Sequence, residues 1–139
     1  MAKGSAGYSG TPLVRKLGLR PDLRVCLLHE PDGFRALLDG IERLDVSTSL
    51  EGEFDYLHLF TDSRAELAAR FETLTGHVAA GGMLWISWPK KSSPLAGDLT
   101  EDGVREIGLR TEFVDVKVCA VDRDWSALKL LRRRNRRRQ

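Results

Sequence analysis

The sequence has no long hydrophobic run and no spacing of residues that marks a metal site or a catalytic motif. None of its apolar segments approaches the roughly 20 residues that a membrane helix needs. Residues 1–7 read Met-Ala-Lys-Gly-Ser-Ala-Gly and contain no apolar stretch of the kind found in secretory signals. These absences predict a cytoplasmic protein without a membrane anchor.

Cysteine is scarce as well, which limits redox and metal chemistry. Cys26 and Cys119 each lie in an apolar, strand-like run. Cysteine in such a run behaves as a small buried hydrophobe. The two lack the spacing of metal ligands and have no base beside them. The sequence therefore predicts no metal site, and no residue is assigned a catalytic role.

The net charge of +2 conceals two parts of opposite sign. Residues 132–139 hold six of the 22 basic residues and none of the 20 acidic ones, so residues 1–131 carry a net charge of −4. A chain of 139 residues fits one domain, and 42% hydrophobic residues can fill one core. We expect a flexible leader at 1–10, one domain at 11–131 and a basic tail at 132–139.

Continuous apolar runs predict strands that are buried on both faces of a parallel sheet. Such runs cover residues 24–29, 54–60 and 83–88, and residues 44–50 form a weaker candidate for an edge strand. Two further runs, 113–121 and 127–131, are joined by a link too short for a crossover, so they are predicted to pair as an antiparallel hairpin.

Helices are predicted between the strands, because capping residues are followed by apolar residues at helical spacing. The clearest start is Ser63, which forms a capping box with Glu66. After Asp32, apolar residues follow the helical spacing at positions 34, 37, 38 and 41. The predicted helices cover residues 12–17, 34–41, 64–80 (ended by Gly81-Gly82) and a segment that follows Thr100.

Strands that alternate with helices define the fold class. This order predicts an α/β protein with three layers: a mainly parallel, doubly wound sheet that ends in an antiparallel hairpin. Over about residues 54–131, including Gly81-Gly-Met-Leu-Trp-Ile-Ser87, the order resembles the second half of the Rossmann-like class I methyltransferase fold.

The methyltransferase resemblance implies two cofactor-binding features in the first half of the chain. One is a glycine-rich turn after the first strand, and the other is an acidic residue at the end of the second strand that holds a ribose. Here the turn reads Leu28-His-Glu-Pro-Asp-Gly-Phe34, with one glycine, and Asp45 lies in a poor strand. The sequence therefore predicts no cofactor.

Other segments resemble a family of small bacterial proteins of unknown function. This resemblance implies a bacterial, cytoplasmic protein and no particular reaction. The matching segments are Gly7-Tyr-Ser-Gly-Thr-Pro-Leu13, Trp88-Pro-Lys-Lys91, Asp98-Leu-Thr-Glu101, Lys117-Val-Cys-Ala-Val-Asp122, Trp125-Ser126 and Leu128-Lys129.

Ligands of open α/β sheets bind beyond the carboxyl ends of the strands. Polar residues follow the three central strands here, and predicted helix N-termini after Asp32 and Ser63 would add N–H donors for an anion. We expect a phosphate or carboxylate there, unless these residues are ordinary caps and turns. The candidates are His29, Asp32, Ser63, Arg64, Trp88, Lys90 and Lys91.

Two histidines lie in or beside the predicted sheet. His58 is in the middle of a strand, so it is predicted to be packed or hydrogen-bonded within the sheet. His29 is at a strand end with Glu30 and Asp32 nearby, which suits either a turn residue or a general base.

Three functions are compatible with these patterns. The favoured one is a non-catalytic binding or regulatory module for an anionic metabolite or a protein partner, because the cofactor turn and a catalytic constellation are missing. The second is an unrecognised enzyme of methyltransferase-like fold. The third is a nucleic-acid-associated protein that acts through counterion release by its tail. That tail would use Arg132, Arg133, Arg134, Arg136, Arg137 and Arg138.

Overall fold

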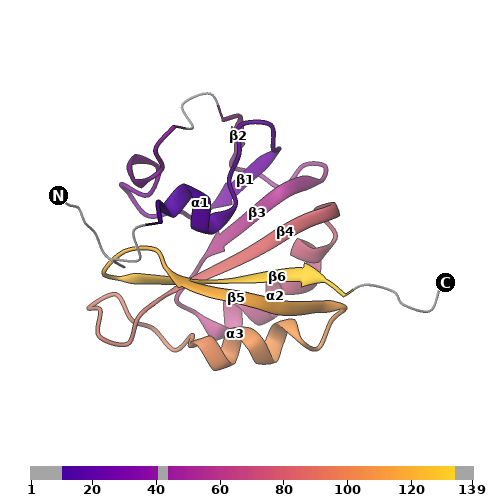
Figure 1. The fold of residues 1–139 in the computed structure, drawn as a ribbon. Coiled ribbons are helices and arrows are strands. Elements are labelled where there is room, and N and C mark those ends of the chain that lie inside the picture. Colours follow the sequence, from indigo (N-terminus) through magenta and orange to yellow (C-terminus); the bar gives the residue numbers. More distant parts are fainter. Residues whose placement is uncertain (1–10, 41–43, 134–139) are drawn as a thin grey trace.

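Six strands form one mixed sheet in the order β2-β1-β3-β4-β6-β5 within the residues that the computed structural model describes, 11–40 and 44–133 (Figure 1). Strands β1 to β4 pair in parallel, and β6 runs antiparallel to both β4 and β5. The predicted parallel sheet with an antiparallel finish is thus confirmed. The strands are β1 (Val25–Leu28), β2 (Val46–Ser47), β3 (Phe54–Phe60), β4 (Val78–Pro89), β5 (Phe113–Ala120) and β6 (Trp125–Arg132).

Helices cover both faces of this sheet, which confirms the three-layer α/β class. Figure 1 shows α2 (Arg64–Thr75) and α3 (Glu101–Gly108) on one side and α1 (Leu13–Leu17) on the other. A short 3-10 turn, η1 (Arg35–Leu37), flanks α1. No helix in the described ranges is long and apolar enough to cross a membrane.

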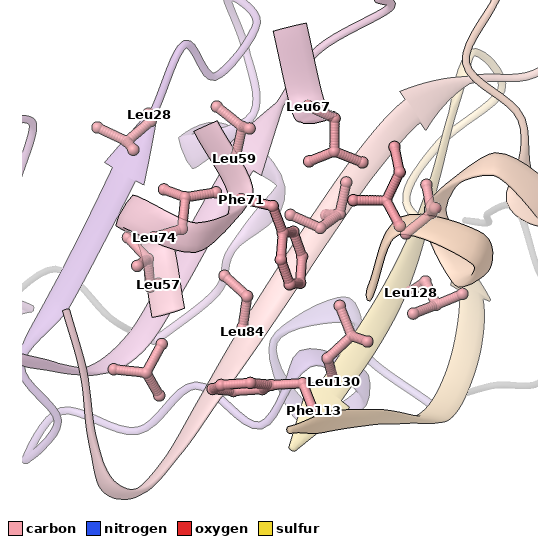
Figure 2. Packing of buried hydrophobic residues seen from close by; sticks show 14 of the residues in the cluster. Leu28, Leu57, Leu59, Leu67, Phe71, Leu74, Leu84, Phe113, Leu128 and Leu130 are labelled. Atoms are coloured by element: carbon pink, nitrogen blue, oxygen red, sulfur yellow. The ribbon is translucent and has the colours of Figure 1, made fainter. Parts of the chain in front are cut away.

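The larger core lies between the sheet and the pair α2 and α3 (Figure 2). Leu67, Phe71 and Leu74 of α2 point onto Leu57 and Leu84 in the central strands, and all five are at most 2% exposed. Burial of each such side chain contributes about 1.5–3 kcal/mol. This cluster holds the two helices, and hence their N-terminal turns, in place against the sheet.

The second core lies on the α1 face and contains a buried polar chain. The hydroxyl of Tyr56 lies 2.8 Å from His58 Nδ1, and His58 Nε2 lies 2.7 Å from Ser87 Oγ. Trp85 Nε1 donates to the Leu17 carbonyl at 3.0 Å, which attaches α1 to the sheet. His58 is 0% exposed and stacks on Phe60, as its mid-strand position predicted. These hydrogen bonds pair the buried polar side chains of Tyr56, His58 and Ser87, and the bond between His58 and Ser87 joins β3 to β4.

The helix predicted over 34–41 does not form, and only η1 is present. Phe34 and Leu38 are buried, but Leu37 is 42% exposed, so the three do not share the core-facing side of a helix. Leu38 is extended, and Gly40 has a φ of 81°, which ends helical geometry. Ile41 lies outside the described residues. Four apolar residues at helical spacing fit a compact turn as well as a helix, and this segment forms the turn.

The helix after Ser63 also ends earlier than predicted. Helix α2 stops at Thr75, because the His77 carbonyl accepts a hydrogen bond from Phe54 N at 2.7 Å and Val78 pairs with Phe54 in the sheet. Val78 is buried as predicted, but it belongs to β4. Gly81, at a φ of 78°, lies within β4 where its register with β3 shifts. The predicted edge strand at 44–50 is confirmed as β2.

The buried state of His58 makes stability depend on pH. Burial lowers the pKa of His58 from about 6.5 to about 3. Between these pH values the imidazole is therefore protonated in the unfolded chain and neutral in the folded chain. This contribution is fully present above pH 6.5 and is lost as the pH falls toward 3. Between pH 6.5 and 5, the free energy of unfolding should fall by up to about 1.4 kcal/mol per pH unit. Urea titrations at several pH values measure the free energy of unfolding of the wild type and of His58→Gln. An equal dependence on pH in both proteins would contradict the prediction.

Candidate functional site

The carboxyl ends of β1, β3 and β4 meet at one edge of the sheet, because these strands are neighbours and run in parallel. Three polar segments follow them: residues 29–33, 61–63 and 90–99. This edge is where open α/β sheets bind ligands.

His29 follows β1 directly and has an unusual backbone conformation. Its φ is 61°, and it is the one non-glycine residue with positive φ among the described residues. This left-handed region costs a residue with a Cβ about 1–2 kcal/mol, although histidine enters it more readily than most. The turn therefore has a backbone that a glycine would adopt without strain, yet it carries an imidazole whose side chain is 57% exposed.

Glu66, in the first turn of α2, is the carboxylate that faces His29. His29 Nδ1 lies 3.8 Å from Glu66 Oε2. The same carboxylate accepts hydrogen bonds from the Thr61 hydroxyl and, at 3.2 Å, from Arg70. The Thr61 hydroxyl, followed by Arg70 and the charge of His29, lowers the pKa of Glu66 although burial opposes this. An anionic carboxylate is thus held in a fixed position beside an exposed imidazole.

Glu66 belongs to this site, although the sequence pattern indicated only a capping role for it. Glu66 was assigned to the capping box, and its N–H does receive a cap from Ser63 Oγ at 3.0 Å. Its carboxylate turns instead to Thr61 at the end of β3. The available signal was a hydroxyl at a strand end, five residues before an acid in the next helix. Glu30, expected near His29, is paired with Arg35 at 2.7 Å.

The structure does not provide the N–H groups that were predicted to bind an anion at two helix N-termini. The N-terminus of α2 is filled by the chain's own Asp98, whose Oδ1 accepts from Arg64 N at 2.8 Å. The side chain of Arg64 points away to Glu106, at 2.9 Å. No α-helix begins after Asp32, so that N-terminus does not exist, and Asp32 is exposed in the turn.

The two lysines after β4 are separated in role. Lys90 Nζ donates to the Asp122 carbonyl at 2.8 Å, and its backbone N–H donates to Asp124 at 2.7 Å. Lys91 is exposed, with no hydrogen bond or ion pair among the described residues. Trp88 is 5% exposed and lines a groove of about 430 Å³ together with both lysines.

The start of the basic tail belongs partly to the fold. Arg132 lies in β6, where its guanidinium contacts Glu112 at 2.8 Å, the Thr75 carbonyl at 3.1 Å and the ring of Phe113. Arg132 is therefore engaged in packing. Arg133 is the last described residue, and Arg134, Arg136, Arg137 and Arg138 lie outside the described residues. The described part of the chain holds no cluster of three or more potential metal ligands.

No known protein family and no curated protein matches the sequence, but solved structures do match the fold. The ribosomal protein L11 methylase from Lactobacillus delbrueckii subsp. bulgaricus matches with a TM-score of 0.59 and 16% identity, over 88% of this chain and 75% of the methylase. The magnesium protoporphyrin IX methyltransferase from Synechocystis PCC 6803, with bound SAM, matches with a TM-score of 0.57 and 16% identity, over 86% of this chain and 74% of that enzyme. The glycopeptide N-methyltransferase MtfA, complexed with sinefungin, matches with a TM-score of 0.53 and 11% identity, over 86% of this chain and 90% of MtfA.

These matches confirm the Rossmann-like, methyltransferase-like fold and extend it beyond residues 54–131 to most of the chain. They also correct the functional expectation. The sequence favoured a non-catalytic binding module, but the matched structures are those of SAM-dependent methyltransferases, which supports the enzyme alternative. The expectation gave the missing glycine-rich turn, ribose carboxylate and catalytic constellation more weight than the intact fold, and it could not foresee the left-handed backbone at His29.

The strain at His29 can be measured with two substitutions that both remove the imidazole. His29→Gly and His29→Ala lose the same contact with Glu66 but differ in their tolerance of a φ of 61°. We expect His29→Gly to be about 1 kcal/mol more stable than His29→Ala, because glycine enters the left-handed region freely. Chemical denaturation of both variants gives this difference, and equal stabilities would show that the turn relaxes to another conformation.

Proposed function

We propose that this protein is an S-adenosylmethionine-dependent enzyme of the class I methyltransferase fold, with its reaction centre at the carboxyl ends of β1 and β3. The observation that carries the proposal is the fold shared with such enzymes over 86–88% of the chain, including one solved with bound SAM. Because one fold can host unrelated activities, the proposal also depends on the residues at this edge.

The backbone of this edge fits an S-adenosyl group. The left-handed turn at His29 follows β1 directly, and a Cβ built on Gly33 would meet no atom within 4 Å, so the space over the turn is open. The side chains differ from the family pattern, since Ser47 and Ser49 stand at and after the end of β2 and Asp45 precedes it. In this proposal the turn at 29–33 holds the amino-acid part, and serine hydroxyls replace a carboxylate at the ribose. Bound there, the cofactor would supply an activated methyl group.

His29 is the group we assign to proton transfer. Methylation of an N–H or O–H group releases a proton, and a neutral imidazole near the acceptor can take it up. Glu66, held by Thr61 and Arg70, faces Nδ1 of His29 and stabilises a positive charge on the ring. This arrangement leaves Nε2 to accept the proton from the substrate. A base oriented by a fixed carboxylate is a recurrent device of enzyme active sites.

Binding of S-adenosylhomocysteine tests the cofactor part of the proposal. At 100 times its dissociation constant a ligand adds roughly 2.7 kcal/mol to stability, which raises the melting temperature of a domain of this size by roughly 5–10 °C. Backbone amide signals of residues 29–33 and 47–49 should shift in NMR spectra. Those of residues 109–112, at the opposite edge of the sheet, should stay in place. No thermal shift and no amide shift at millimolar ligand would reject the assignment.

Turnover tests the role of His29. We expect the protein to form S-adenosylhomocysteine from S-adenosylmethionine when a small-molecule extract of bacterial cells supplies the acceptor. Removal of a general base costs about 10²–10⁴ in rate, so His29→Ala should lose about a hundredfold or more in rate while its affinity for S-adenosylhomocysteine is retained. Glu66→Gln should lose part of the rate, whereas Glu72→Gln, an exposed position on the same helix, serves as the control. Full activity in His29→Ala would assign the proton to another group.

The finer sequence-based expectations stay proposals. Membership of the bacterial family of unknown function, and with it a cytoplasmic location, is supported by the segments from Gly7-Tyr8 to Leu128-Lys129. A small anionic ligand as partner is supported by the ammonium of Lys91 at the carboxyl edge, which has no hydrogen bond or ion pair with the residues that the structure describes.

A further inference from the structure

The groove beside β4 has the size and position of a second ligand site. It measures about 430 Å³, within the range of small-molecule pockets. It lies between the carboxyl end of β4, the start of α3 and Ser126 of β6. Neither the turn after β1 nor the pair His29 and Glu66 contributes to its lining.

Two apolar side chains of the larger core contribute to the lining of the groove. Trp88 and Leu99 line it, and both belong to the larger core with exposures of 5% and 2%. Leu99 N–H is bonded to the Asp62 carbonyl at 3.1 Å, which attaches this part of the lining to the end of β3. The indole N–H of Trp88 has no hydrogen-bond partner among the described residues. Every fully buried side-chain N or O atom in that part of the chain has a partner, so this N–H reaches solvent. This donor is therefore available to a ligand.

The charged walls of the groove divide into engaged and free groups. Lys90 is held by the Asp122 carbonyl, and Glu101 is paired with Arg105 at 2.8 Å. Lys91 has no partner among the described residues, and the side chain of Asp102 is 99% exposed, no nearer than 3.9 Å to Arg105. One groove thus presents one free ammonium and one nearly free carboxylate over a tryptophan and a leucine.

We propose that this groove binds a small amphoteric molecule with an apolar body, such as an aromatic amino acid. Its carboxylate is bound by Lys91 and the Trp88 N–H, its amine by Asp102, and its apolar part packs on Trp88 and Leu99. A ligand with a single charge would leave either Lys91 or Asp102 unmatched. This binding does not rest on the proposed function.

Three related probes test this charge pattern by isothermal titration calorimetry without any S-adenosyl compound. L-phenylalanine carries both charges, phenethylamine only the amine and 3-phenylpropionate only the carboxylate. We expect L-phenylalanine to bind about three- to tenfold more tightly than either analogue, as expected for one added, partly exposed charge pair. Equal affinities for the three probes, or no binding of L-phenylalanine, would overturn the proposal.

Single substitutions assign the two ends of the probe. Lys91→Gln should weaken the binding of L-phenylalanine and 3-phenylpropionate but leave that of phenethylamine unchanged. Asp102→Asn should weaken the binding of L-phenylalanine and phenethylamine but leave that of 3-phenylpropionate unchanged. Arg15→Gln on α1 and Asp39→Asn near η1 remove the same charges elsewhere and should change nothing. Binding that is insensitive to both groove variants would place the probe at another site. Loss of S-adenosylhomocysteine binding with intact amino-acid binding would reject the methyltransferase and keep the groove, and the converse would reject only the groove.

Discussion

Parallel pairing of β3 with β1 and β4 is the constraint on which the site depends. It brings three strand ends to one edge and sets their order, so that the turn at His29 lies beside Thr61 and the groove lies beyond β4. Side chains of both cores hold this pairing, with the hydrogen-bonded chain of Tyr56, His58 and Ser87 linking β3 to β4 inside the sheet. All three of these side chains are fully buried.

A contact within the chain divides this edge into two parts. Asp98 occupies the N-terminus of α2, and Leu99 is bonded to the end of β3. The segment after β4 is thereby fixed over the start of α2, between the pair His29 and Glu66 and the groove at Trp88. An anion cannot use the N–H of Arg64, which Asp98 already satisfies, so the groups left for a ligand at this edge are the imidazole on one side and Lys91 on the other.

The fold could be predicted further than the site, and the reason lies in the range of the interactions. Continuous apolar runs and the caps at Ser63 and Thr100 are local signals, and they identified most strands and the starts of α2 and α3. The spacing after Asp32 failed because four apolar residues cannot distinguish a helix from a turn that buries Phe34. The site depends on pairs distant in sequence, such as His29 with Glu66 and Arg64 with Asp98, which no local pattern encodes.

His29 stands in the turn where the methyltransferase resemblance implied glycine. Its φ of 61° is one that glycine adopts without strain, and the residue letters of the turn do not reveal this backbone conformation. Strain of this kind persists only where the surroundings enforce it, and it is most common at functional sites. Glycine would remove the strain and would also remove the one imidazole that faces the carboxylate of Glu66. In the proposed function, this cost in stability is the consequence of placing a proton acceptor at the carboxyl edge of the sheet.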